Sequence, residues 1–150
     1  MTEAAASSRG RLVGRFDVHA VPAEVAAFRH ALGSDAGDTG VPPTYPARWL
    51  ALSEVRAALL AALDLAAGPA PGEMPQVVLV HLQQRFAYCA PLQAGGRYAM
   101  DLYLAPKAQA GGLALTAEIL SNERLCCRAQ GRFALIPRGS LPLGAPEAPA

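Results

Sequence analysis

The stretch HLQQRFAYCAPLQAGG at residues 81–96 decides the fold. Its side chains alternate as they do in a β-strand, which places Phe86 and Tyr88 on one face. The opposite face carries Arg85, Ala87 and Cys89. We expect a strand that ends at Pro91-Leu92 and turns at residues 94–96 into a second strand.

The same period of two continues toward the C-terminus. It predicts strands over residues 97–104 and 113–119, and a tight turn over residues 121–124 leads to a strand over residues 125–135. Cys126 and Cys127 alternate faces on this last strand, so we expect one to be buried and the other to face outward. A further strand is predicted nearer the N-terminus, over residues 11–18.

Two earlier segments have helical spacing. The first begins at Pro22 and ends at Gly33, and it places Val25, Phe28, Ala31 and Leu32 on an apolar stripe. The second begins at Pro46 and continues to about Ala67, unless Ser53 caps a second helix after a short break. Packing the sheet around this helix predicts an α+β fold, an antiparallel β-sheet wrapped around a long central helix.

The composition limits the possible functions. The chain has 150 residues, which fits one domain, and 52% are hydrophobic against 17% charged. This apolar balance favours an oligomer, in which a second apolar surface is buried. A net charge of +1 without a basic cluster argues against nucleic-acid binding. No apolar run reaches the roughly 18 residues of a membrane span.

The ends and the cysteines complete this outline. We expect a disordered N-terminus at residues 1–10, a single folded domain at 11–136 and a Pro-rich disordered tail at 137–150. The N-terminus has no apolar signal region. Three cysteines form neither a disulfide framework nor a metal-binding spacing. These features predict a cytoplasmic protein with reduced thiols and no metal site.

Residues 81–95 resemble a segment of the MaoC-like hydratase and dehydratase family, H-x-x-Q-x-F-x-Y-x-x-P-L-x-x-G. A second block, VPPTYP at residues 41–46, resembles the V-P-P-T-F-P of the N-terminal, non-catalytic half of double-domain members. The same half occurs as the supporting subunit of heterodimeric (3R)-hydroxyacyl-carrier-protein dehydratases. The resemblance implies a hot-dog fold, in which sheets join edge to edge to form dimers. The first block matches at His81, Gln84, Phe86, Tyr88, Pro91, Leu92 and Gly95.

The catalytic signature of that family, G-D-x-N-P-x-H, is incomplete here. The corresponding stretch, GSDAGDT at residues 33–39, keeps an aspartate at Asp35 or Asp38 but no histidine follows it. Without an imidazole the acid/base step lacks its proton carrier. This departure agrees with the non-catalytic half, in which no residue is catalytic.

Several residues remain candidates for the site. Asp35, Glu54 and His81 are the weak catalytic candidates. The substrate-binding candidates are Tyr45, Trp49, His81 and Tyr88. For Tyr45 and Trp49 the alternative is ordinary core packing. For His81 the alternative is a purely structural role. Arg128 and Arg132 share a face with Gln130; this face is either solvated or meets a phosphate of coenzyme A or phosphopantetheine.

These features favour a non-catalytic subunit that binds the acyl chain of a coenzyme A or carrier-protein thioester. It would pair with itself or with a catalytic hot-dog partner and need no cofactor beyond the carrier of the acyl group. Two alternatives remain open. One is an active dehydratase or thioesterase with a divergent site, and the other is a small-molecule-binding scaffold.

Overall fold

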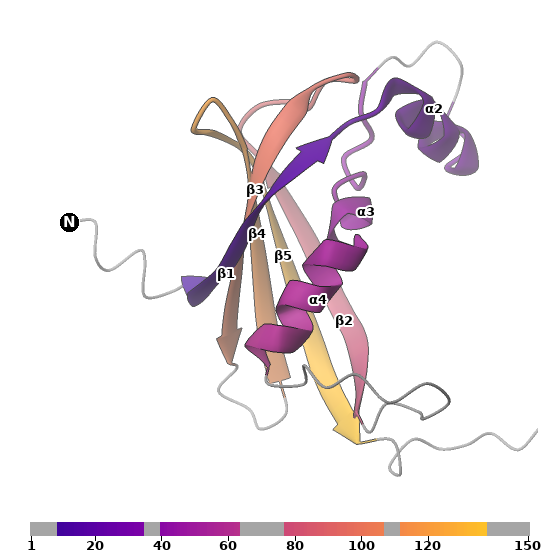
Figure 1. The fold of residues 1–150 in the computed structure, drawn as a ribbon. Helices are drawn as coiled ribbons and strands as arrows, with labels where there is room; N and C mark the ends of the chain where they lie inside the picture. Colours follow the sequence, from indigo (N-terminus) through magenta and orange to yellow (C-terminus); the bar gives the residue numbers. More distant parts are fainter. Residues whose placement is uncertain (1–8, 35–39, 64–76, 107–111, 138–150) are drawn as a thin grey trace, which may run out of the picture.

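A five-stranded antiparallel sheet forms the body of the molecule (Figure 1). The computed structural model describes residues 9–34, 40–63, 77–106 and 112–137. The strands lie in the order β1-β3-β4-β5-β2, so β1 and β2 are the edges. Their bounds are β1 Arg11–His19, β2 Val77–Tyr88, β3 Arg97–Pro106, β4 Gly112–Ser121 and β5 Arg124–Pro137.

The period of two in the sequence gives each strand one apolar face. Met100 of β3 faces Ile119 of β4, which faces Cys127 of β5, and all three are completely buried. Residues one position along the strands point to the other face of the sheet, hereafter the outer face. β4 and β5 are joined through Asn122 and Glu123, whose positive φ angles of 49° and 63° are those of a tight hairpin turn. The predicted turn is confirmed.

In the described segments three helices accompany the sheet: α2 Pro22–Ala31, α3 Ala47–Leu50 and α4 Ser53–Ala62. Figure 1 shows α4 lying across one face of the sheet, where Val55 and Leu59 join the core. The prediction of an α+β fold with a sheet around a central helix is confirmed. None of the helices in the part of the chain that the structure describes is long and apolar enough to cross a membrane.

The central helix is broken before Ser53, which is the second of the two possibilities that the sequence left open. Leu52 is extended (φ −60°, ψ 143°), and α4 begins at the next residue. The break turns Leu52 toward the core, against which it is partly buried. Ser53 begins the second helix but does not cap it, because its hydroxyl bonds the carboxylate of Glu54 instead. The helix ends at Ala62, and Ala67 lies outside the described residues.

The connection from β2 to β3 is a crossover, not the hairpin that the sequence indicates. Gly95 makes the expected turn, with φ at +84°. However, β2 pairs with β5, and β3 lies between β1 and β4. Residues 89–96 therefore carry the chain from one edge of the sheet toward the other, and no described strand pairs with the free edge of β2.

Two smaller predictions are wrong. The apolar stripe of α2 reaches the core only through Val25 and Phe28, and Leu32 is 55% exposed because α2 lies at one end of the molecule (Figure 1). Cys126 and Cys127 are both buried. Cys126 points to the outer face, but the chain leaving β2 folds across it, and the N–H groups of Cys89 and Ala90 both donate to its carbonyl oxygen.

The ends of the domain were predicted at residues 11 and 136. Residues 1–8 and 138–150 lie outside the described part of the chain. Arg9, just before the predicted start, forms an ion pair with Glu118 on β4 at 3.1 Å. Pro137, just after the predicted end, is the last residue of β5.

Candidate functional site

The two sequence blocks at residues 41–46 and 81–95 meet at the end of β2. The hydroxyl of Tyr88, the last residue of this strand, donates a hydrogen bond of 2.6 Å to the carbonyl oxygen of Pro43. Pro43 belongs to the turn that leads into α3, in which Tyr45 N–H donates to Pro42. The hydrogen bond joins this turn to the edge strand.

An apolar groove of about 470 Å³ lies around this contact. We call it the β2 groove. It lies where the chain that leaves β2 after Tyr88 passes beside the proline-rich turn. The strand thus ends before Pro91-Leu92, where the sequence placed its end. The residues that line the groove are Val41, Pro43, Tyr88, Cys89, Ala90, Pro91 and Leu92.

Tyr45 and Trp49, two of the substrate-binding candidates, lie in the core. Their rings meet edge to face at 5.5 Å, between Phe28 at 5.3 Å and Tyr98 at 6.0 Å. Such edge-to-face arrangements stabilise buried aromatic pairs. The row of rings holds the turn that carries Pro43, so both residues support a wall of the groove, and neither is among the residues that line it.

His81 is on the same strand as Tyr88 but does not line the groove. They are seven positions apart, which corresponds to roughly 23 Å along a strand. The imidazole is exposed and stacks on the Phe133 ring with 4.6 Å between the centroids. Its Nε2 lies 3.0 Å from the carbonyl oxygen of Gln83.

Glu54 and His81, the catalytic candidates that the structure describes, do not form an acid–base pair. Glu54 is exposed in the first turn of α4, where the Ser53 hydroxyl lies 3.3 Å from its carboxylate. Asp35 and Asp38 lie outside the described residues. Within residues 9–34, 40–63, 77–106 and 112–137, no carboxylate is paired with an imidazole.

Two ionisable groups, one on the groove and one facing it on β5, have raised pKa values. Removal from water raises the pKa of the Tyr88 phenol. Burial also raises the pKa of the Cys127 thiol. Tyr88 and Cys127 therefore carry no charge near pH 7, which suits an apolar ligand better than nucleophilic chemistry.

Gln84 matches the family block, but its residue type alone indicated no function. Both its amide oxygen and its amide nitrogen are buried without a hydrogen-bond partner. The side chain lies over Gly131 of β5, where an added Cβ would approach the amide oxygen to 3.0 Å and the Phe133 ring to 2.7 Å. A buried unpaired amide is rare in folded proteins, and the match of Gln84 to the family block was the only sign of it in the sequence.

No protein-family model matches the chain, and no curated protein is significantly similar to it. Solved structures do match. C-terminally truncated HadBC, a (3R)-hydroxyacyl-ACP dehydratase complex from Mycobacterium tuberculosis, has a TM-score of 0.58 at 16% identity, covering 83% of this chain and 96% of that one.

Two further structures show the same likeness. The (R)-hydratase from A. caviae involved in PHA biosynthesis has a TM-score of 0.50 at 22% identity, covering 83% of this chain and 94% of the hydratase. The gentisyl-coenzyme A thioesterase BH1999 has a TM-score of 0.56 at 11% identity, covering 83% and 88%. At these identities the likeness concerns the fold. The strand order, the helix across one face of the sheet and these structural matches together show that the chain has the hot-dog fold.

Proposed function

We propose that the protein is a non-catalytic hot-dog subunit that binds the acyl chain of a coenzyme A or carrier-protein thioester. The observation that carries this proposal is the Tyr88–Pro43 contact, which brings the two family-like blocks together around an apolar groove. Proteins with the same fold include a dehydratase of hydroxyacyl-ACP and a coenzyme A thioesterase. The acyl carrier, coenzyme A or phosphopantetheine, is the only cofactor in this proposal. We place the protein in the cytoplasm as part of the same proposal.

The properties of the groove support binding more than catalysis. A volume of about 470 Å³ lies within the usual range for small-molecule sites, roughly 300–1,000 Å³. The lining is apolar, and Tyr88 is held neutral. A fatty chain needs contact area and few polar partners, which the prolines, Val41 and Leu92 provide.

The free edge of β2 supports a paired assembly. The outer side of this twelve-residue strand has no hydrogen-bonded neighbour among the described strands. Leu82, at the register shift of β2, is 61% exposed. Long exposed edges are usually covered by another chain. In this proposal a second copy or a catalytic hot-dog partner covers β2; HadBC, of the same fold, is itself a complex.

The first test is to measure crotonyl-CoA hydration and hydrolysis of a short acyl-CoA panel by the purified chain, with the melting temperature recorded for each ligand. A stabilising shift that grows with acyl length, without turnover, supports the proposal. Turnover by the pure chain contradicts the non-catalytic role. No shift with any acyl-CoA contradicts the thioester class and favours the scaffold.

A pair of variants locates the ligand. Ala90→Phe fills the β2 groove and should abolish the acyl-dependent shift. Ala87→Phe adds the same ring to an exposed position of β2 whose side chain points to the outer face, and should leave the shift unchanged. If both variants lose the acyl-dependent shift equally, or if both keep it, the β2 groove is not the acyl site.

An active thioesterase is the second candidate, favoured by the fold shared with a coenzyme A thioesterase. In that case Glu54, Asp35 or His81 would supply the chemistry. The hydrolysis assay distinguishes the thioesterase from the non-catalytic subunit, because only the thioesterase turns over acyl-CoA. If turnover is found, its loss in Glu54→Gln or Asp35→Asn identifies the residue responsible.

A further inference from the structure

The outer face of the sheet contains a hollow of about 320 Å³. It lies over the middle of the sheet, on the side away from α4, as the alternation along each strand requires. Arg85 and Gln83 of β2 line it together with Gln130 and Arg132 of β5, and Arg9 lines it as well. We call it the arginine hollow.

The register of the strands explains its shape. Arg132 lies between Gln83 on β2 and Ala114 on β4, and Ala114 faces Ala105 on β3. Long side chains on the β2 side therefore stand beside two methyl groups, which leaves the space open. In the neighbouring row, Gln130 lies between Arg85 and Thr116, so the two arginines occupy a diagonal of β2 and β5.

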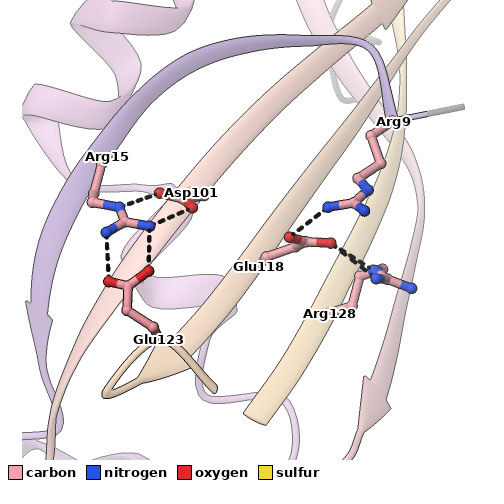
Figure 2. Close-up of polar contacts among 6 residues, drawn as sticks. All are labelled: Arg9, Arg15, Asp101, Glu118, Glu123 and Arg128. Atoms are coloured by element: carbon pink, nitrogen blue, oxygen red, sulfur yellow. Dashed lines mark hydrogen bonds and ion pairs between the residues drawn. The ribbon is translucent and has the colours of Figure 1, made fainter. Parts of the chain in front are cut away.

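The acids beside the hollow are already paired (Figure 2). Asp101 accepts two hydrogen bonds from Arg15, at 2.6 and 2.9 Å. Glu118 is bonded by Arg128 at 2.9 Å and by Arg9 at 3.1 Å. Arg128, which the sequence made a candidate for phosphate, is thus held by Glu118.

Two of the three arginines that line the hollow lack such partners among the described residues. None of its lining residues is acidic. In the part of the chain that the structure describes, Arg85 and Arg132 form no ion pair, and Arg9 bonds Glu118 through Nη1 alone. Two unpaired guanidinium groups on one hollow, with a third close by, make a positive region that favours an anion.

We propose that the arginine hollow binds a phosphoryl anion. Arg85 and Arg132 donate to the phosphoryl oxygens, Gln83 and Gln130 add neutral amide donors, and Arg9 closes the side toward β1. Guanidinium groups suit this ligand because their planar N–H donors match phosphate oxygens in pairs. The site lies on the face of the sheet opposite α4 and does not depend on the proposed acyl binding.

The test is a titration of the purified protein with inorganic pyrophosphate at low ionic strength. Calorimetry and amide NMR chemical shifts monitor the binding. Sodium chloride at matched ionic strength is the reference. Binding should exceed the chloride effect and perturb the amides of Ala105, Ala114 and Gln130 more than those of the β2 groove. Shifts scattered over the surface, or binding no stronger than that of chloride, overturn the proposal.

A double variant, Arg85→Gln with Arg132→Gln, should weaken pyrophosphate binding at least about tenfold, the effect of one lost charge-assisted contact. Its matched control is Arg56→Gln with Arg97→Gln, which removes the same charge from two exposed arginines outside the hollow. Equal weakening in both double variants would mean non-specific attraction and overturn the site.

Coenzyme A and a separate phosphorylated molecule are distinguished by competition. If coenzyme A is the source, it competes with pyrophosphate, and an S-acyl-N-acetylcysteamine, which has no phosphate, does not. If a separate molecule is the source, pyrophosphate binds while coenzyme A fails to displace it. Both results support the site. An acyl ligand that binds normally to the double variant shows that the groove and the hollow are independent.

Discussion

Glu118 and Arg128 face each other across β4 and β5, and Nε and Nη2 of Arg128 donate to the same carboxylate oxygen at 3.1 and 2.9 Å. Arg9 bonds the other oxygen, so this buried carboxylate has a cation on each side. A buried charge depends on such partners, because it has lost most of its hydration.

Glu118→Gln should therefore lower the free energy of unfolding by about 2 kcal/mol, since it leaves two guanidinium groups without their anion. Urea denaturation measures the loss. Glu123→Gln is the control, because that side chain is 72% exposed and its pair with Arg15 should contribute less than about 1 kcal/mol. Equal losses in the two variants would contradict the importance of burial.

Gln84→Met should leave stability unchanged or raise it by about 1 kcal/mol. The amide is buried without partners, and methionine has a similar length without polar groups to desolvate. Thermal denaturation of Gln84→Met, compared with Gln83→Met on the exposed face, measures the difference. A clear loss of stability would show that the amide is hydrogen-bonded in solution, for example to water.

Tyr88→Phe should cost about 1 kcal/mol, because the Pro43 carbonyl loses its hydrogen bond. The same variant should weaken acyl binding, since the turn is no longer joined to β2. Tyr103→Phe is a matched control: in the described part of the chain no hydrogen bond is found for the Tyr103 hydroxyl. Unchanged acyl affinity in Tyr88→Phe would contradict the role of this contact.

Stability should fall at alkaline pH in part because of Cys127. Burial raises its pKa, so the thiol stays protonated in the folded protein while the unfolded chain ionises above roughly pH 8.5. The free energy of unfolding should be level up to that pH and then decline, by up to about 1.4 kcal/mol per pH unit until the folded thiol ionises.

Urea denaturation between pH 7 and 10 tests this prediction. Cys127→Ala should decline less than the wild type over that range, whatever its stability at pH 7. Parallel curves would show that the Cys127 thiol has an ordinary pKa in the folded protein. The Tyr88 phenol, whose pKa is also raised, adds a decline above roughly pH 10.

The local parts of the fold were predictable from the sequence. The period of two identified all five strands, and the β4–β5 turn follows from its short polar loop. The order of the strands was not predictable in this way, because Pro91 and Gly95 look the same in a hairpin and in a crossover. The pairing of β2 with β5 depends on contacts between distant residues, which no local pattern encodes.

The site was predictable only in part. Tyr88 was a candidate, and the structure places it in the groove, but its partner Pro43 lies 45 residues earlier in the chain. Arg132 was a phosphate candidate together with Arg128, but its position beside Arg85 could not be foreseen, because the two become neighbours only through the register of β2 and β5. Tyr45 and Trp49 have a spacing that suits both a core and a tunnel, and the structure shows the core position.

The strand order also has a consequence for how the chain folds. β3, β4 and β5 are joined by short connections, whereas each edge strand pairs with a distant one: Arg11 with Leu104, and Val77 with Pro137. Closing such long loops is slow because ordering the chain precedes the gain in contacts. We expect the three central strands to form first, and pulsed hydrogen exchange during refolding should protect β4 before β1 and β2. The edge strand proposed to meet a partner would then be among the last parts completed, which leaves time for two chains to meet while β2 is still unpaired.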